Sequence, residues 1–303
     1  MTRRERFVSG RILVVAFEGW NDAGEAASGA VRALKKRLTV SPISSVDPEV
    51  YFDYQFNRPT VSIRDDGSRR LSWPEGTLYG PSPTARSEVE GLSDTSPSDV
   101  ADEANSDNAN NIYLLIGTEP SRSWQSFCAE IIDAALAADI SGIVFLGAML
   151  ADVPHTRPIS IFVTSESAEV RAALHIERSD YEGPVGILGA LGEAAEDAGI
   201  PTLSIWASVP HYVHNAPSPK ATLALIDKVE PMIGVAIPRG DLVGEGAAWE
   251  KGIDALAGED DEMASYIRQL EQARDTVDSP EASGEAIAQE FERYLRRRDP
   301  GSG

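Results

Sequence analysis

Four short, largely apolar segments constrain the fold of this chain more than any other feature. They are residues 11–17, 112–116, 143–146 and 202–207, and each is followed by a loop rich in glycine and polar residues. A strand without a polar interior is buried on both faces, as in a parallel sheet. Helical patterns separate or follow these segments, at about residues 26–38, 123–138, 168–174 and 218–232, and a further helix is opened by the glycine-rich run 183–189 and ends near residue 198. The alternation predicts an α/β fold, with a mainly parallel sheet between two helical layers.

The ends of these helices carry recognisable signals. Asn21 or Asp22 is a plausible N-cap for the first helix, and Ser218 followed by proline starts the last one. In the helix over 123–138, Phe127, Ile131, Ile132 and Leu136 are expected to share the apolar face. The single cysteine, Cys128, lies in this helix and is interpreted as a small core residue.

Residues 50–73 interrupt the alternation. The segments 50–56 and 60–63 favour strands, Asp65-Asp-Gly-Ser68 is a turn signal, and 69–73 is the returning strand. We expect an antiparallel hairpin at the sheet edge, with aromatic side chains exposed toward a neighbouring subunit. These aromatics are Tyr51, Phe52, Tyr54, Phe56 and Trp73. Residues 88–111 are acidic, lack an apolar period and are predicted to be a mobile loop.

Beyond residue 237 the pattern is purely helical. Apolar residues recur at helical spacing over 242–257, 262–277 and 284–298. The sequence therefore predicts two parts, an α/β core domain over 1–237 and a helical C-terminal extension over 238–303.

The charge of the chain restricts its partners. It has 303 residues, with 27 Lys and Arg against 48 Asp and Glu, a formal net charge of −21. This argues against general binding of nucleic acid or anionic membranes, which needs basic side chains. No apolar run approaches the roughly 20 residues of a membrane span, and the N-terminus leads into a strand without a signal-peptide pattern. With one cysteine and so no intrachain disulfide, a cytoplasmic location is expected.

Polar side chains concentrate in the four loops that follow the apolar segments. These loops are residues 19–24, 117–124, 147–157 and 208–214. The carboxyl ends of parallel strands meet at one sheet edge, where ligands of open α/β sheets bind. We expect one shared cleft there, formed by Trp20, Asn21, Asp22, Glu119, Trp124, Asp152, His155, Thr156, Arg157, His211, Tyr212 and His214. The loop 147–158, stiffened by two prolines, is its centre. Another apolar run, over 159–164, follows this loop at once and is expected to be a second core strand beside it.

Several chemistries fit this set. His155 with Asp22 or Asp152 could form a base and its orienting partner, and Arg157 could hold an anionic substrate. These four residues are the catalytic candidates. A metal could be held by Asp152, His155, His211 and His214, but no ligand spacing typical of a metal site supports it. No nucleophile elbow or phosphate-binding lysine motif occurs, and no cofactor is predicted.

Four motifs carry a resemblance to a known family. They are Gly-Trp-Asn-Asp-Ala-Gly at 19–24, Gly-Thr-Glu-Pro with a following Trp at 117–124, the segment 147–158, and Trp-Ala-Ser-Val-Pro-His-Tyr-Val with Pro-Ser-Pro at 206–219. In order and spacing they resemble the bacterial, actinobacterial-type branch of the proteasome assembly chaperone 2 family. The resemblance runs from about residue 9 to 235.

The resemblance implies a sandwich similar to the phosphorylase/hydrolase-like fold, and self-association into a homo-oligomer, with a trimer as one arrangement. Eukaryotic relatives help proteasome α-rings assemble, and archaeal relatives behave like assembly chaperones. Eukaryotic members dock largely through C-terminal tails, and this chain ends without their hydrophobic-Tyr-x pattern. Some bacterial members carry a carboxylate–amine ligase label, but no nucleotide-binding motif here supports it.

Two readings of function follow. In the first, the protein is a non-enzymatic, chaperone-like member that binds itself and another protein complex. In the second, it is a small-molecule enzyme or sensor that uses the cleft at the strand ends. The missing nucleophile and nucleotide motifs favour the first, whereas the crowding of Asp22, His155, Arg157 and His211 in polar loops favours the second. A third option is that the polar loops only lock a subunit interface.

Overall fold

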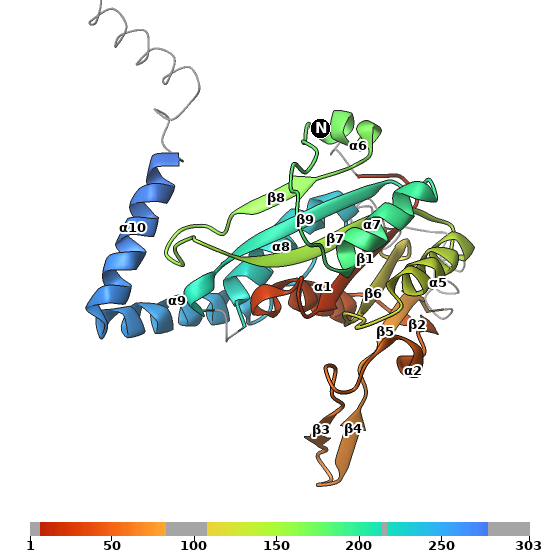
Figure 1. Ribbon diagram of the computed structural model, residues 1–303, viewed down its shortest axis with the longest axis horizontal. Helices are drawn as coiled ribbons and strands as arrows, with labels where there is room; N and C mark the ends of the chain where they lie inside the picture. Colours follow the sequence, from red (N-terminus) through yellow and green to blue (C-terminus); the bar gives the residue numbers. More distant parts are fainter. Residues whose placement is uncertain (1–6, 83–107, 214–216, 278–303) are drawn as a thin grey trace, which may run out of the picture.

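A seven-stranded sheet in the order β2-β5-β6-β1-β7-β9-β8 forms the centre of the molecule (Figure 1). The structure is a computed structural model that describes residues 7–82, 108–213 and 217–277. The strands are β1 (Arg11–Glu18), β2 (Val40–Ser45), β5 (Gly76–Pro81), β6 (Ile112–Thr118), β7 (Ile140–Ala151), β8 (Ile161–Thr164) and β9 (Thr202–Pro210). The neighbours β6, β1, β7 and β9 run parallel, as predicted, whereas β5 and β8 are antiparallel to their neighbours.

Alternating side chains of the central strand β1 enter two separate cores. Ile12, Val14 and Ala16 pack with α1 (Ala26–Arg37) and α8 (Pro219–Ile233) on one face. Leu13, Val15 and Phe17 pack with α5 (Trp124–Ala137) and α7 (Ile187–Asp197) on the other. Because successive strand residues point to opposite faces, an apolar strand needs cover on both sides. The predicted three-layer α/β/α arrangement is therefore confirmed.

The signals read from the sequence for α5 and α8 hold, with one exception. Ser218 caps α8, with Pro219 at its first position, and Cys128 is buried in α5. Leu136, which was expected on the buried face of α5, is exposed. It lies in the last turn of the helix, beyond the buried Ala135, so its side chain points to solvent.

Residues 47–81 differ most from the prediction. The segment expected as a strand begins instead with the short helix α2 (Pro48–Tyr51), capped by Asp47. Tyr51 and Phe52 are buried in the core, and the Tyr51 ring meets Phe127 edge to face, so two of the aromatics expected on the surface are not there. Strand β5, which the sequence analysis missed, follows and pairs with β2 and β6.

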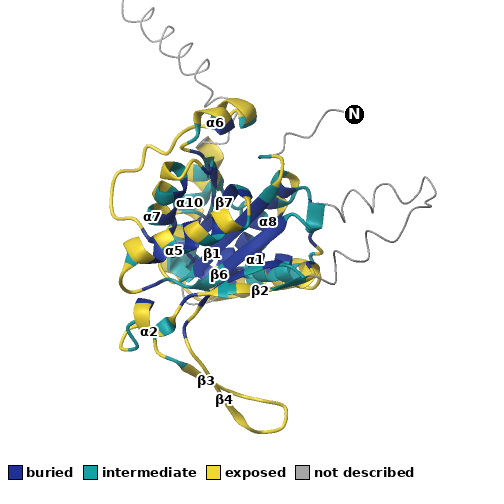
Figure 2. Ribbon diagram, turned by 90° about the vertical axis from the view of Figure 1, so that its right-hand side faces the viewer, coloured by how far each residue is buried: buried dark blue, intermediate teal, exposed yellow. Residues whose placement is uncertain are grey.

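The predicted hairpin exists but stands apart from the main sheet. Strands β3 (Thr60–Ile63) and β4 (Arg69–Ser72) pair only with each other, and all eight of their residues are exposed. Figures 1 and 2 show the hairpin projecting from the body like an arm. Phe56 and Trp73 at its base are exposed, as expected. The predicted insertion at the sheet edge is therefore wrong.

Two strands near the central loop also correct the prediction. β7 does not end at residue 146 but continues to Ala151, paired with β9 along its length. The loop therefore starts five residues later than expected. The segment 159–164, predicted as a core strand, forms the antiparallel edge strand β8, on which Phe162 is exposed. The short helix α6 (Ala168–Leu174) follows.

Two of the three predicted C-terminal helices are present, α9 (Leu242–Gly258) and α10 (Asp261–Val277). Helix α9 packs against α8 and buries Ile253 and Ala257. The third, over 284–298, and most of the acidic loop over 88–111 lie outside the described residues. The division at residue 237 stays a prediction. Among the residues that the structure describes, no helix has the length and apolar character to cross a membrane.

Candidate functional site

The four polar loops follow β1, β6, β7 and β9, so all four begin at the same edge of the sheet. The chain segments that follow the neighbouring strands β1 and β6 cross to opposite faces of the sheet. The helix after β1, α1, covers one face, and the helix after β6, α5, covers the other. Such a switch in direction opens a crevice beyond the strand ends. The hydrogen bonds divide the predicted site residues at this edge into two groups.

The first group, which we call the Glu119 group, lies at this crevice and contains Trp20, Asn21, Asp22, Glu119 and Trp124. The Glu119 carboxylate accepts hydrogen bonds from the Asn21 side chain (3.1 Å) and from the backbone N–H of Ile187 (2.8 Å). It also accepts one from the backbone N–H of Trp20 (3.3 Å). Since Ile187 is the first residue of α7, the carboxylate lies at a helix N-terminus, where negative charge is favoured. Glu119 thus joins β1, β6 and α7.

Asp22 has a structural partner rather than a histidine. Its Oδ1 accepts hydrogen bonds from the backbone N–H groups of Ala27 (2.8 Å) and Ser28 (3.1 Å) in the first turn of α1. The predicted N-cap position is therefore wrong, since Glu25, in the left-handed region, is the N-cap of α1, but the Asp22 side chain still satisfies two backbone N–H groups of the first turn. Burial raises the pKa of Asp22 above its usual range, against the opposing effect of these hydrogen bonds.

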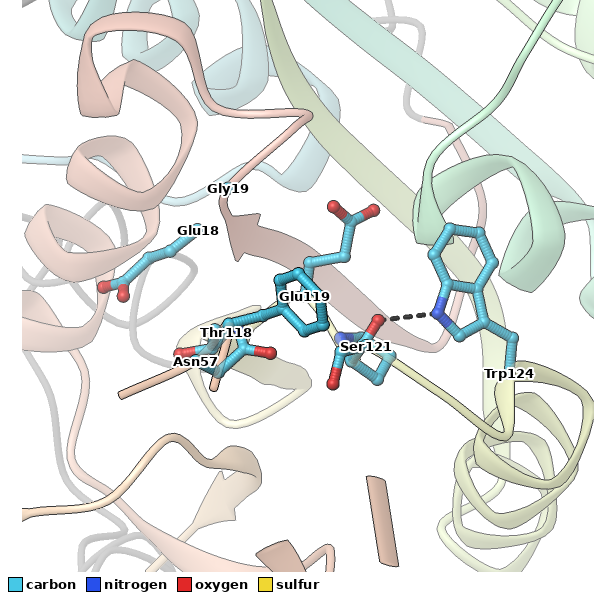
Figure 3. Close-up of a pocket in the computed structure, with 9 residues that line it drawn as sticks. Glu18, Gly19, Asn57, Thr118, Glu119, Ser121 and Trp124 are labelled. Atoms are coloured by element: carbon cyan, nitrogen blue, oxygen red, sulfur yellow. Dashed lines mark hydrogen bonds between the residues drawn. The ribbon is translucent and has the colours of Figure 1, made fainter. Parts of the chain in front are cut away.

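An open pocket of about 380 Å³ adjoins the Glu119 group (Figure 3). Its lining comes from the ends of β1 and β6 and from the base of the hairpin arm: Glu18, Gly19, Phe56, Asn57, Thr118, Glu119, Pro120, Ser121 and Trp124. The Trp124 indole N–H donates to the Pro120 carbonyl (2.6 Å), which fixes the ring beside the pocket. Trp20 itself is 73% exposed.

The second group, which we call the His155 group, lies at the ends of β7 and β9 and contains Asp152, His155, Thr156, Arg157, His211 and Tyr212. His155 is its centre and is only 1% exposed. The Tyr212 hydroxyl accepts from the His155 backbone N–H (2.8 Å) and lies 2.9 Å from Nδ1. Nε2 lies 3.1 Å from Asp254 of α9. Both ring nitrogens therefore have a partner, and which of them donates depends on the tautomer.

The rest of the His155 group binds α10. Arg157 makes a two-pronged contact with Asp275, with both N–O distances 2.7 Å, and contacts Glu271 (3.2 Å). Thr156 donates to the same glutamate. Asp152 accepts a hydrogen bond from Tyr266 (3.3 Å).

Other side chains close this group from the remaining sides. His211 lies 3.1 Å from Asp152, and its ring packs edge-on against Tyr266. Lys220 of α8 donates to the His155 carbonyl and to Glu250 of α9. Burial raises the pKa of Tyr212 to about 12, because the phenolate would lose its hydration. The whole group is therefore a polar lock between the sheet edge and the C-terminal helices.

This arrangement changes the predicted chemistry. The partner of His155 is Asp254, not Asp22 or Asp152, since Asp22 accepts from the first turn of α1 and Asp152 contacts His211 and Tyr266. Arg157 is held by two carboxylates of this same chain. The shared cleft was predicted as one site, but the described residues form two groups with different partners. His214 lies outside the described residues.

Sequence reasoning missed the residues that complete the His155 group, namely Trp249, Asp254, Tyr266, Glu271 and Asp275. They lie about a hundred residues away along the chain, so local spacing could not connect them. One signal was present: Glu271 and Asp275 are four residues apart, so they share one face of a helix. A pair of carboxylates on one helix face predicts a basic partner, and Arg157 was such a residue.

The comparisons with known proteins agree with one another. The family model described as the PAC2 family matches residues 16–257. A Streptomyces avermitilis PAC2 family protein is 38% identical, with 85% of this chain and 99% of that one covered and a TM-score of 0.68. A Mycobacterium tuberculosis proteasome-assembly chaperone homologue is 38% identical, with 84% and 99% covered and a TM-score of 0.67.

A more distant structure supports the fold alone. The Pyrococcus furiosus archaeal homologue of proteasome-assembly chaperone is 18% identical, with 88% of this chain and 96% of that one covered and a TM-score of 0.54. No curated protein matches the chain. The family match extends over most of the sequence and reaches into α9, so it includes both groups of site residues except their contacts on α10. The chain belongs to the PAC2 family.

Proposed function

We propose that this protein works by binding other proteins, as a chaperone-like member of the PAC2 family, and not by converting a small molecule. The observation that carries the proposal is the state of His155. It is 1% exposed, and both ring nitrogens have a partner within 3.1 Å. A general acid or base must reach the proton that it transfers. Because α9 and Tyr212 occupy both nitrogens, this histidine serves packing rather than turnover.

The relatives support a partner of a particular kind. The M. tuberculosis protein is described as a proteasome-assembly chaperone homologue. We propose that proteasome subunits before their assembly are the partner of this protein too, in the cytoplasm.

The experiment is an assembly assay with separately purified α- and β-subunits of an actinobacterial proteasome. We expect a complex of this protein with the α-subunits by native mass spectrometry, and faster formation of half-proteasomes by native electrophoresis. His155→Gln, if it remains folded, should act like wild type, because the histidine has no catalytic role here. An unrelated protein of similar net charge controls for non-specific attraction.

The small-molecule reading makes the opposite prediction. Under that reading a metabolite would raise the unfolding temperature of the wild type, by several degrees at about 100 times its Kd. The shift would vanish in a folded His155→Gln variant. That result, together with no binding to proteasome subunits, would overturn the proposal.

A further inference from the structure

The pocket beside the Glu119 group has walls that suit an organic cation. Its lining comes from the ends of β1 and β6 and from the base of the hairpin arm, and it includes two carboxylates and no basic side chain. Two aromatic residues also line it, Phe56, which is 80% exposed, and Trp124. The faces of aromatic rings attract Lys and Arg cations. The pocket therefore offers both negative charge and aromatic rings to a positively charged group.

The ring of Trp124 is fixed before any ligand arrives. Its indole N–H, the only polar group of the side chain, donates to the Pro120 carbonyl (2.6 Å). In Figure 3 the ring lies on one side of the pocket and Asn57 on the other, with the Glu119 carboxylate between them in this view. A ring that is already held loses little conformational freedom when a ligand stacks on it. What remains available on Trp124 is its aromatic face.

Glu119 carries a negative charge that no cation balances within the described part of the chain. Its three hydrogen bonds all come from neutral N–H groups. The other lining carboxylate, Glu18, differs because it pairs with Arg32 of α1. Neutral donors orient a carboxylate, whereas a cationic donor forms a stronger, charge-assisted hydrogen bond with it. Glu119 is thus the charge that a cationic ligand would meet in this pocket.

A second acceptor in the same pocket lacks a donor. The side-chain oxygen of Asn57, Oδ1, is buried, and the residues that the structure describes give it no hydrogen-bond partner. Buried polar atoms are nearly always paired, so an unpaired one calls for an explanation. A ligand with several N–H donors supplies one for Asn57 and others for Glu119. This second observation is independent of the charge of the pocket and indicates the same kind of ligand.

These features favour arginine over the other cationic side chains. Its guanidinium carries five N–H donors in one plane and stacks on aromatic rings, whereas lysine has three donors on a compact ammonium group. Because the pocket is open, it does not enclose a free small molecule in the way that small-molecule sites do. It suits one side chain of a protein that covers its mouth. The formal net charge of −21 favours the approach of such a basic surface.

We propose that this pocket binds the guanidinium group of an arginine side chain on the partner protein. The group stacks on Trp124 and donates to the Glu119 carboxylate and to Asn57 Oδ1. That the arginine belongs to a partner protein rests on the proposed function. The preference of the pocket for a guanidinium is a property of this chain alone and is tested without a partner.

The first experiment titrates the full chain with N-acetyl-arginine N-methylamide, which represents one arginine of a protein. The indole N–H signal of Trp124, assigned by its loss in Trp124→Phe, reports binding by NMR. We expect it to shift with half-saturation at about 1–10 mM, as for a single anchoring group. The citrulline analogue has nearly the same shape but no charge, so it should bind at least about tenfold more weakly.

Three variants separate the contributions to binding of this arginine probe. Glu119→Gln keeps an oxygen for the N–H donors but removes the charge, and should weaken binding at least about tenfold. Phe56→Ala removes an exposed ring, so it should fold, and should weaken binding about two- to fivefold. Glu193→Gln removes an exposed carboxylate of α7 outside the pocket and should bind like wild type. Circular dichroism checks that each variant is folded.

The second experiment asks whether the partner protein uses the pocket. In the binding assay with proteasome α-subunits, Glu119→Gln and Phe56→Ala should weaken the complex, and Glu193→Gln should not. The arginine probe at about 10 times its own Kd should release α-subunits from the wild type, whereas the citrulline analogue at the same concentration should leave them bound.

Two results would overturn the proposal. Equal responses of the Trp124 signal to the arginine and citrulline probes, including no response to either, would mean that the pocket does not select a cation. A complex with α-subunits that is unchanged in both pocket variants would mean that the partner places no arginine there. Failure of the wild type to bind α-subunits counts against the proposed function instead, because the titration still decides what the pocket binds.

Discussion

Among the residues of the polar lock, His155 is the one whose replacement should lower the free energy of unfolding most. His155→Ala removes the imidazole contacts to Tyr212 and Asp254 and leaves a cavity where a side chain only 1% exposed was packed, although the Tyr212 hydroxyl keeps the backbone N–H of residue 155. A large-to-small change at a buried position costs the lost contacts plus the cavity, so we expect the free energy of unfolding to fall by about 2–4 kcal/mol. Chemical denaturation measures it.

His175 provides the matched control for that variant. It is exposed and sits in the left-handed region at φ 53° after α6. Because asparagine tolerates this backbone conformation, His175→Asn should change the free energy of unfolding by less than about 0.5 kcal/mol. Equal losses in the two variants would contradict the importance assigned to His155.

Asp22 predicts a pH dependence of stability. Burial raises the pKa of its carboxyl in the folded protein. As the pH rises through the ordinary carboxyl range toward this raised value, the unfolded chain ionises before the folded one, so the folded state loses stability. Asp22→Asn cannot ionise and should gain stability relative to wild type as the pH rises above the ordinary Asp pKa of about 4. Thermal unfolding across this range gives the difference.

The control for Asp22 should move in the opposite direction. Hydrogen bonds from Ser68 lower the pKa of Asp66, an exposed carboxyl in the turn of the arm. Its ionised form therefore stabilises the folded state above the ordinary carboxyl pKa, and that contribution disappears as the pH falls through the lowered value. Asp66→Asn should lose stability relative to wild type as the pH rises. The same sign for both variants would contradict the assigned causes.

At the scale of elements, the docking of α10 depends on charged pairs. Arg157 lowers the pKa of Asp275 in the folded protein. The ion pair therefore stabilises the docking of α10 at pH values above the ordinary carboxyl pKa, and this contribution is lost as the pH falls through the lowered pKa. At neutral pH, Arg157→Gln should raise amide exchange in α10 by about two- to fivefold. Arg178→Gln, which breaks a surface pair away from α10, should leave that exchange unchanged.

The sequence was sufficient to predict the strands that are surrounded by apolar side chains on both faces. Strands such as β1 and β6 have no polar interior, so they had to lie inside a parallel sheet between helices. It was insufficient where a helix cap competed with strand propensity, as at Asp47, which starts α2 just before Tyr51 and Phe52.

Strand β5 was not predicted because its glycines interrupt the apolar pattern of a strand. The neighbouring strand β6 needs a glycine opposite β5, at Gly117, because a Cβ there would lie 2.0 Å from the Glu75 carbonyl oxygen.

For the candidate site, the sequence likewise predicted one part and not the other. Parallel strands alone predicted that the four loops share one sheet edge. Apart from the spacing of Glu271 and Asp275, nothing local indicated that α9 and α10 would cover one half of that edge, because Asp254 and Asp275 are about a hundred residues from His155 and Arg157. A set of polar residues in loops has the same composition whether it faces a ligand or a helix. Only the tertiary packing distinguishes the two.

For the whole molecule, the net charge of −21 predicts a response to salt. Like charges repel across a compact surface and destabilise it, and salt screens this repulsion. Raising NaCl from about 0.05 M to about 0.5 M should raise the unfolding temperature of the protein by about 2–4 °C. Near pH 4.5, close to the sequence pI, the same step should have little effect. A fall at neutral pH would mean that attractive pairs dominate instead.

The position of β1 at the middle of the sheet has a consequence for synthesis of the protein. Ile12 pairs with Ile112 on one side, and Leu13 pairs with Ile143 on the other. At about 5–20 residues per second, a ribosome needs roughly 5–20 s to make the hundred residues between β1 and its first central neighbour. During that time the most apolar strand of the nascent chain has no partner within the sheet. The nascent chain of this protein, one of whose relatives is described as a proteasome-assembly chaperone homologue, thus exposes an aggregation-prone strand until β6 has been made.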